Sequence, residues 1–184
     1  MSSIVISGNT SGTVTLSAPD VSGTTVLTLP TTSGTVITTG STFAGNGPAF
    51  SAYAGSATSL GNGVSTKVLF NTEEFDTNSN YDTSLSRFTP TIAGYYQVTS
   101  SINTAAYISS NSQLVIHKNG SNFKVGLQFG NSGNTAGVTV EALIYMNGST
   151  DYLEIYAYHG SGGSVNTNAN ATSTYFQAVM VRSA

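Results

Sequence analysis

Short runs in which apolar and polar residues alternate recur along most of the chain. A period of two sends successive side chains to opposite faces of a strand, and the β-branched and aromatic residues in these runs fit a half-buried sheet. No segment has the 3.6-residue apolar period and the caps of a helix. In the larger C-terminal part of the chain we expect strands over 67–70, 94–98, 113–117, 138–145, 152–158 and 175–181.

The segments between these runs are rich in Asn, Gly and Ser. Lys118-Asn119-Gly120-Ser121 predicts a tight hairpin, because Asn-Gly accepts the positive φ angles of a two-residue turn, and Met146-Asn147-Gly148-Ser149 repeats that chemistry. Many short antiparallel strands joined by such turns predict an all-β sandwich, with an antiparallel jelly roll as the leading architecture.

The N-terminal part contains a repeat with a spacing of 11 residues. Ser-Gly-Thr recurs at Ser11, Ser22 and Ser33, and each copy is followed by alternating apolar residues, at 14–16, 26–29 and 36–38. This pattern predicts a turn followed by a strand, three times over. Such short strands cannot close a core alone, so we expect residues 1–40 to form a β-rich trimeric stalk; a flexible Ser/Thr/Gly linker is the alternative.

Chain-breaking residues are concentrated between Gly40 and Pro48 and indicate a domain boundary. We therefore expect an N-terminal stalk or attachment segment over residues 1–40, a linker over 41–47 and a head domain over 48–184.

Composition excludes several classes of protein. Five Lys plus Arg against eight Asp plus Glu give a net charge of −3 with no basic run, which argues against nucleic-acid binding. The chain is 39% hydrophobic and 10% aromatic, enough apolar surface to offset the entropy cost of folding. It contains no Cys, so disulfides and thiolate sites are absent. No run is long enough to predict membrane insertion, and the first residues lack the features of a signal peptide.

A set of residues spaced along the head resembles the C1q/TNF-like jelly-roll family. The run from Phe70 to Asp76 is followed by Tyr81-Asp82, Phe88-Thr89-Pro90 and Gly94-Tyr95-Tyr96, and the segments 48–53 and 173–181 are similar to that family's first and last strands. The resemblance covers residues 48–184, and this chain departs from it at Val98 and Ser100, where further aromatics are usual. The family positions are Phe70, Asp76, Tyr81, Phe88, Gly94, Tyr96 and Phe176.

The resemblance implies a compact homotrimer with chain termini at the base and binding loops at the apex and flanks. The run 152–158 agrees with this, because Tyr152, Glu154, Tyr156 and Tyr158 share one face and Tyr suits a partly polar subunit interface; an exposed Tyr ladder is the alternative. The segments 12–19 and 27–36 are similar to segments of bacteriophage tail-fibre proteins. The two resemblances together indicate the tip of a virion fibre.

Motifs for catalysis and cofactor binding are missing from the sequence. There is no Gly-Lys of a P-loop, no Gly-x-Ser-x-Gly and no His-Glu-x-x-His, and His117 and His159 are the only imidazoles. Residues 76–80 imitate the first half of a calcium loop, but Tyr81 and Arg87 stand where Gly and Glu are needed, so a polar loop is favoured. We expect no enzyme activity, no metal and no cofactor.

Loops rich in Asn, Ser, Gly and Tyr are the candidate binding surface, because these residues give adaptable hydrogen bonds beside an aromatic platform. Solvated turns of the same composition are the alternative. The candidate receptor-binding residues are Tyr107, Asn111, Asn131, Asn134, Tyr158, His159, Asn166 and Asn168.

The sequence thus predicts a non-enzymatic, homotrimeric phage tail-fibre or receptor-binding protein of the virion. Its expected partners are copies of itself, a host-surface glycan or protein at the head loops, and a phage tail or baseplate protein at the N-terminal segment. The alternatives are a structural virion fibre or decoration protein without receptor binding, and a secreted C1q-like adhesin of a bacterial surface.

Overall fold

The computed structural model describes residues 3–7, 10–17, 23–24, 31, 47–106, 111–128 and 137–184. The chain divides into two compact units, Met1–Val36 and Ile37–Ala184. The described residues of both units form strands and turns and contain no helix. Accordingly, none of these residues belongs to a helix that could span a membrane.

The first unit contains an antiparallel hairpin of β1 (Ser3–Ser7) and β2 (Thr13–Ser17). The turn between them includes Gly12 at φ +78°, which agrees with the predicted Ser-Gly turn before 14–16. The predicted strands at 26–29 and 36–38 lie outside the described residues. The sequence analysis did not identify β1.

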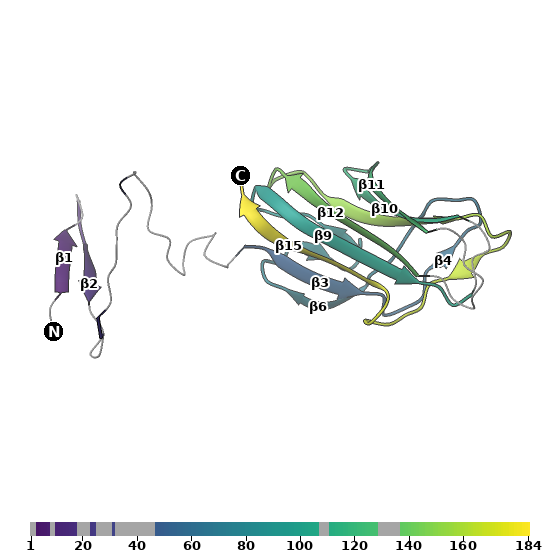
Figure 1. Cartoon of the computed structure of the whole chain (residues 1–184), viewed down its shortest axis with the longest axis horizontal. Helices are drawn as coiled ribbons and strands as arrows, with labels where there is room; N and C mark the ends of the chain where they lie inside the picture. Colours follow the sequence, from purple (N-terminus) through teal and green to yellow (C-terminus); the bar gives the residue numbers. More distant parts are fainter. Residues whose placement is uncertain are drawn as a thin grey trace. The chain divides into compact units, whose positions relative to one another are not determined.

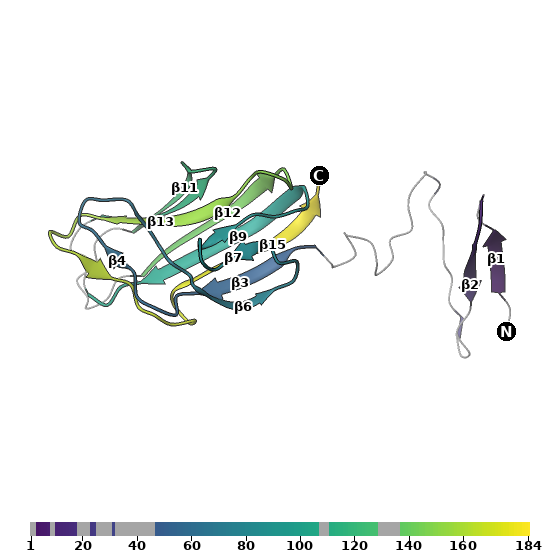
Figure 2. The same cartoon turned by 180° about the vertical axis from the view of Figure 1, so that it is seen from behind.

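The second unit, called the head below, is built from two antiparallel sheets that face each other (Figures 1 and 2). The five-stranded sheet has the order β12 (Gly137–Met146), β9 (Gly94–Asn103), β15 (Tyr175–Ser183), β3 (Ala49–Tyr53), β6 (Thr72–Asp76). The six-stranded sheet has the order β11 (Ser121–Gln128), β10 (Ser112–Lys118), β13 (Leu153–His159), β8 (Arg87–Phe88), β7 (Tyr81–Asp82), with β5 (Thr66–Lys67) also paired to β13. A small sheet of β4 (Ser59–Leu60) and β14 (Val165–Asn166) completes the head.

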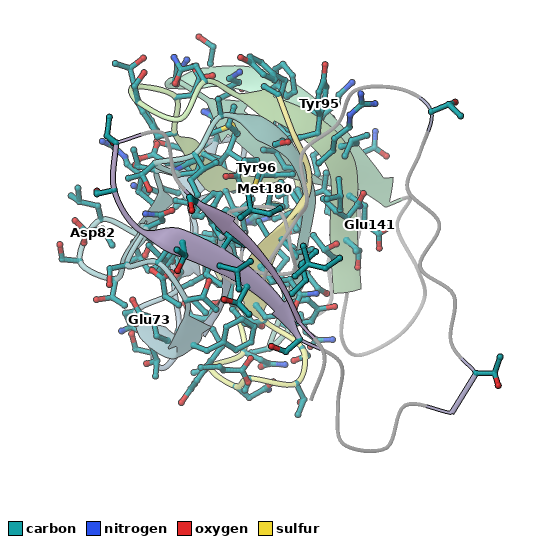
Figure 3. The ribbon with its side chains drawn as sticks, turned by 90° about the vertical axis from the view of Figure 1, so that its left-hand side faces the viewer. Glu73, Asp82, Tyr95, Tyr96, Glu141 and Met180 are labelled. Carbon is teal, nitrogen blue, oxygen red and sulfur yellow. The ribbon has the colours of Figure 1, made fainter. Side chains whose placement is uncertain are left out.

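The long strands confirm the predicted alternation. In β9 the residues Tyr96, Val98 and Ile102 are buried, while Tyr95 is 41% exposed. Figure 3 accordingly labels Tyr96 in the middle of the head and Tyr95 nearer its rim. The predicted strands at 94–98, 113–117, 138–145, 152–158 and 175–181 coincide with β9, β10, β12, β13 and β15, whereas only the start of 67–70 is a strand.

The two Asn-Gly pairs have different roles. Asn119 and Gly120 have φ angles of +54° and +79° and connect β10 to its neighbour β11, which confirms the predicted hairpin. Asn147 and Gly148 instead connect β12 in one sheet to β13 in the other. Here the Asn147 carboxamide oxygen accepts hydrogen bonds from three backbone N–H groups, those of residues 149, 150 and 151. The same dipeptide therefore makes a turn between sheets, and the prediction of a second hairpin is wrong.

Aromatic side chains fill the space between the sheets. The Phe50 ring stacks on Tyr81 and Phe88 at centroid distances of 4.6 and 4.5 Å and meets Phe176 edge-on at 4.9 Å. Burial raises the pKa of Tyr81, and its hydroxyl donates to the Phe70 carbonyl oxygen at 2.8 Å. These rings tie β3, β7, β8 and β15 into one core.

Ser100 shows how the head accommodates a small polar residue where the family that its sequence resembles usually has an aromatic. Ser100 lies opposite Phe176 in the register of β9 and β15, and both side chains are buried. The Ser100 hydroxyl donates to the Tyr175 carbonyl oxygen at 2.9 Å, which satisfies its polarity inside the sandwich.

A buried carboxylate links three strands on the outer face of the six-stranded sheet. Glu154 of β13 is 3% exposed, and its Oε1 accepts hydrogen bonds from Lys67 Nζ at 2.7 Å and from Arg87 Nε at 2.9 Å. Burial alone opposes ionisation, but the hydrogen bonds and positive charges of Lys67 and Arg87 outweigh it and hold the Glu154 pKa below its ordinary value. This triad fixes β5 and β8 against β13.

The two ends of the head have different contents. Gly94 of β9 lies opposite Met146 and Ser183. The Met180 N–H donates to the Pro48 carbonyl oxygen. The first and last residues of the head domain therefore lie at one end, which we call the base. The opposite end, called the distal end, contains the β4–β14 sheet (Figure 1). The position of the two ends of the head domain at the base agrees with what the family resemblance implies for the chain termini.

Replacing Phe88 with Ala is expected to destabilise the head by about 3–5 kcal/mol, because it removes a fully buried ring from the aromatic core and leaves a cavity. Phe123→Ala is the matched control: Phe123 is 44% exposed on β11, so its loss is expected to change stability by less than about 1 kcal/mol. Denaturant unfolding at fixed protein concentration measures both values. Equal losses in the two variants would contradict the assigned core.

Glu154→Gln is expected to lower stability at pH 7 by about 1–3 kcal/mol, because Lys67 and Arg87 lose their charged acceptor. Since the folded pKa lies below the ordinary 4.5, the contribution of the carboxylate is complete above that pH and is lost as pH falls through the folded pKa. The difference between wild type and variant should therefore shrink as the pH falls below 4.5 and through the folded pKa. Glu73→Gln, at an exposed position, is the control, and a pH-independent difference would refute the role of the triad.

Candidate functional site

Five of the predicted binding residues lie among the described residues, and all five are near the distal end of the head. Ser112 pairs with His159, the backbone of Asn62 bridges to His159, and the Ala105 N–H donates to the Asn166 carbonyl oxygen. These contacts bring the start of β10, the end of β13 and β14 together. Tyr107, Asn131 and Asn134 lie outside the described residues.

An open hollow with a volume of about 590 Å³, called the distal depression below, lies at this end. Its described lining residues are Asn111, Gln113, Tyr158 and Gly160. Asn111 and Tyr158 were predicted as binding residues, while Gln113 and Gly160 were missed. The available signal for Gln113 was a polar residue next to the apolar Leu114 at the start of the predicted strand 113–117.

The alternation of β10 and β13 explains why these side chains face outward. Leu114 and Ile155 are fully buried against the aromatic core, so their neighbours along each strand point to the other face. Gln113 lies directly opposite Tyr158 in the strand register, and both are half-buried. An amide and a phenol ring therefore lie side by side at the edge of the depression.

His159 has a structural role, which corrects its selection as a contact residue. Its ring is fully buried; Nε2 lies 3.0 Å from the Leu60 carbonyl oxygen and Nδ1 lies 2.8 Å from Ser161 Oγ. Because a carbonyl oxygen only accepts, Nε2 carries a proton, and Nδ1 can then accept from the Ser161 hydroxyl. The imidazole joins the loops around residues 60 and 161 and offers nothing to a partner at the surface.

The two asparagines of the 159–170 segment differ in availability. The Asn166 side chain is exposed. Asn168 is half-buried, and its Nδ2 donates to the Asn103 carboxamide oxygen at 2.6 Å, while its backbone N–H donates to the Asn103 carbonyl oxygen. Asn166 is therefore free to contact a partner, whereas Asn168 holds the loop against β9.

Toward the base, the outer face of β13 is occupied by contacts within the chain. The Arg87 guanidinium lies 3.9 Å above the Tyr152 ring, and the His117 ring stacks on Tyr156 at 3.9 Å. Burial lowers the pKa of His117, although the charge of Glu154 opposes this shift, so the neutral imidazole is favoured. Of the three tyrosines on this face, Tyr158 is the one that lines the distal depression.

The loop that imitates a calcium site uses its carboxylate internally. Asp76 Oδ2 accepts the Tyr81 N–H at 2.7 Å, and Oδ1 accepts the Asn78 N–H at 3.2 Å. Ser79 turns the chain at φ +53°. Among the described residues, no three His, Asp or Glu side chains gather as they would around a metal ion. Asp76 thus organises the turn between β6 and β7, which accounts for a polar residue at this family position.

The outer face of the five-stranded sheet carries an unusual number of exposed apolar side chains, called the apolar face below. Their exposed fractions lie between 41% and 57%. Strand register places Tyr145 opposite Tyr95, and Val179 and Leu143 on either side of Gln97, so these residues are neighbours on one surface. The apolar face consists of Phe75, Tyr95, Leu143, Tyr145, Val179 and Val181.

Two hollows of about 560 and 300 Å³ lie along the apolar face, one beside Leu143 and Val181 and one beside Phe75 and Val179. Sequence reasoning missed this surface and favoured the tyrosines of β13 as an interface. Apolar residues at the outward positions of both β12 and β15 were the available signal. It could be recognised only once the two strands were known to share a sheet.

A scan with protein-family models and a comparison with curated protein sequences each found no match to the chain. Solved structures do match the head. The globular domain of the zebrafish complement 1qA protein is 15% identical with a TM-score of 0.55, and the match covers 74% of this chain and 99% of that one.

Two further solved structures extend this comparison. The Eiger TNF from S. frugiperda is 12% identical with a TM-score of 0.58, covering 74% of this chain and 93% of that one. The PRD1 vertex protein P5 is 18% identical with a TM-score of 0.54, covering 73% of each chain. The described part of the head therefore has the all-β, antiparallel jelly-roll fold of C1q and TNF domains, as its aromatic pattern predicted.

Proposed function

We propose that this protein is a non-enzymatic, homotrimeric attachment protein of a phage virion, which holds the host surface through the distal end of its head. The observation that carries the proposal is the apolar face on a C1q/TNF-like jelly roll. The virion assignment is supported by the likeness to the PRD1 vertex protein P5 and by the tail-fibre-like sequence of the N-terminal segment.

The first step is self-association through the apolar face. Large clustered apolar side chains on a soluble head are typical of an interaction surface, because their exposure to water is unfavourable. Tyr95 and Tyr145 are suited to such a surface, since each presents an apolar ring with a polar tip. The resemblance to C1q/TNF domains implies three copies rather than two.

The second step concerns the N-terminal hairpin. Ile4 pairs with Leu16 and Ile6 with Val14, so four aliphatic side chains share one face, and each is more than half exposed. A two-stranded hairpin is only marginally stable in water by itself. Hairpins from three chains, packed through these faces, would form the stalk that presents the head and attaches it to a tail or baseplate protein.

The third step is multivalent binding at the distal end. The chain enters and leaves the head at the base, so a stalk attached there leaves the distal loops facing away from the virion. Three copies of a weak site on one rigid trimer gain about 10²–10⁴ in avidity when they engage together. A structural fibre or decoration protein shares the fold and differs in having no ligand at this end.

Leu143→Glu is expected to convert the trimer to monomer, because it places three carboxylates in a desolvated interface. Leu85→Glu is the matched control, since Leu85 is 47% exposed in a loop of the other sheet and its replacement leaves association unchanged. Analytical ultracentrifugation should give three times the 18.9 kDa chain mass for wild type and control, and a single chain mass for Leu143→Glu. A monomeric wild type would remove the basis of the proposal.

Fluorescently labelled full-length chain is expected to adsorb to at least one strain in a panel of bacteria with different surface polysaccharides. Monomeric Leu143→Glu should wash off about 100-fold faster or more, because it lacks avidity. Leu85→Glu and heat-unfolded chain are the positive and negative controls. Trimers that adsorb to none of the strains would favour the structural virion component instead.

A further inference from the structure

We propose that the distal depression binds a neutral saccharide, with the Tyr158 ring as the stacking surface and the Gln113 and Asn111 carboxamides as the hydrogen-bonding groups. This inference rests on the proposed attachment function and specifies its ligand and its site. It follows from the size of the hollow, from the chemistry of its lining and from the charges around it.

The hollow has the dimensions of a small-ligand site. Its volume of about 590 Å³ falls within the range of roughly 300–1,000 Å³ that is usual for such sites. It lies on an outer sheet face near the distal loops and is open to solvent. A long polymer bound there can extend beyond the protein. An oligosaccharide chain suits an open site of this kind, since one or two of its units can bind while the rest extend into solvent.

The lining residues offer an aromatic ring for the apolar face of a sugar and carboxamides for its hydroxyl groups. The half-buried Tyr158 presents an aromatic ring whose partner across the strands is Gln113, and the exposed Asn111 lies just before the same strand. A carboxamide has two donors and an acceptor and can therefore bind two neighbouring hydroxyls. Gly160 adds no side chain, so the ligand can approach the backbone there.

The charges on this face favour a neutral ligand. The described lining of the depression contains no charged side chain. The closest cation along the same face, Lys67, lies opposite Tyr156 in the register and is bound to Glu154 at 2.7 Å. A carboxylate, sulfate or phosphate group on the ligand would lack a free partner and would lose its hydration. Uncharged hydroxyl groups exchange their hydrogen bonds with water for hydrogen bonds with the carboxamides of the lining.

The decisive experiment is an array of printed oligosaccharides, neutral and acidic, probed with the full-length chain. Binding to one or more neutral oligosaccharides is expected. Tyr158→Ala should weaken the interaction by at least about tenfold, and Gln113→Ala by about three- to tenfold, as the loss of one stacking contact or one hydrogen-bonding group predicts. Tyr158→Phe, which keeps the ring, should retain most of the affinity.

Two variants control for general effects. Tyr152→Ala removes the tyrosine that lies just before the base end of β13, and Phe123→Ala removes an exposed ring from β11 of the same sheet. Both should bind like wild type. Unfolding curves and ultracentrifugation of each variant establish that the fold and the oligomer are intact, so that a loss of binding reports on the site.

The outcomes separate this inference from the proposed function. If the wild-type trimer adsorbs to cells and the Tyr158→Ala and Gln113→Ala variants adsorb as well as wild type, the proposed attachment function is supported. The assignment of the distal depression as the binding site is then wrong. Preference for acidic oligosaccharides, or competition by a protein and by no sugar, overturns the assigned ligand class. If the trimer binds neither cells nor any oligosaccharide, the attachment function fails and this inference fails with it.

Discussion

The stacking of aromatic rings between the two sheets is the interaction on which the rest of the head depends. Phe50, Tyr81, Phe88 and Phe176 come from strands that are up to about 130 residues apart in sequence, and their mutual contacts hold the sheets in one relative position. With 20 glycines and no cysteine, the chain has much backbone entropy to overcome and no disulfides to reduce it. Aromatic packing therefore supplies the fixed frame from which both outer faces are presented.

The sequence predicted the parts of this frame that depend on local pattern. Alternation located the long strands β9, β10, β12, β13 and β15, because each buries one face against the core for at least seven residues. The aromatic pattern that includes Phe70, Phe88 and Phe176 indicated this jelly roll through its resemblance to the C1q/TNF-like family. The hairpin at Asn119 followed from the two positive φ angles that Asn-Gly accepts.

Features that depend on tertiary contacts could not be predicted in this way. Strands of two residues, such as β5 and β8, have no periodicity and exist because they pair with β13. Asn147-Gly148 has the letters of a hairpin, yet the burial of Met146 in one sheet and Leu153 in the other makes it a crossing between sheets. His159 was placed among surface loop residues because nothing local reveals the Leu60 carbonyl oxygen that binds it.

The two outer faces of the head differ in how many contacts their side chains make within the chain. This difference supports the different roles that we propose for them. On the six-stranded sheet, Glu154 binds Lys67 and Arg87, and Arg87 lies above the Tyr152 ring. The buried His117 ring stacks on Tyr156, while its two nitrogens have no hydrogen-bond partner. On the five-stranded sheet, Tyr95 and Tyr145 contact each other, but all six residues of the apolar face stay exposed and would gain from contact with another copy. Association through the apolar face would leave Tyr158 and Gln113 on the opposite sheet, open to solvent. The proposed trimer could therefore form and bind a ligand at once, because the two proposed processes use different sheets.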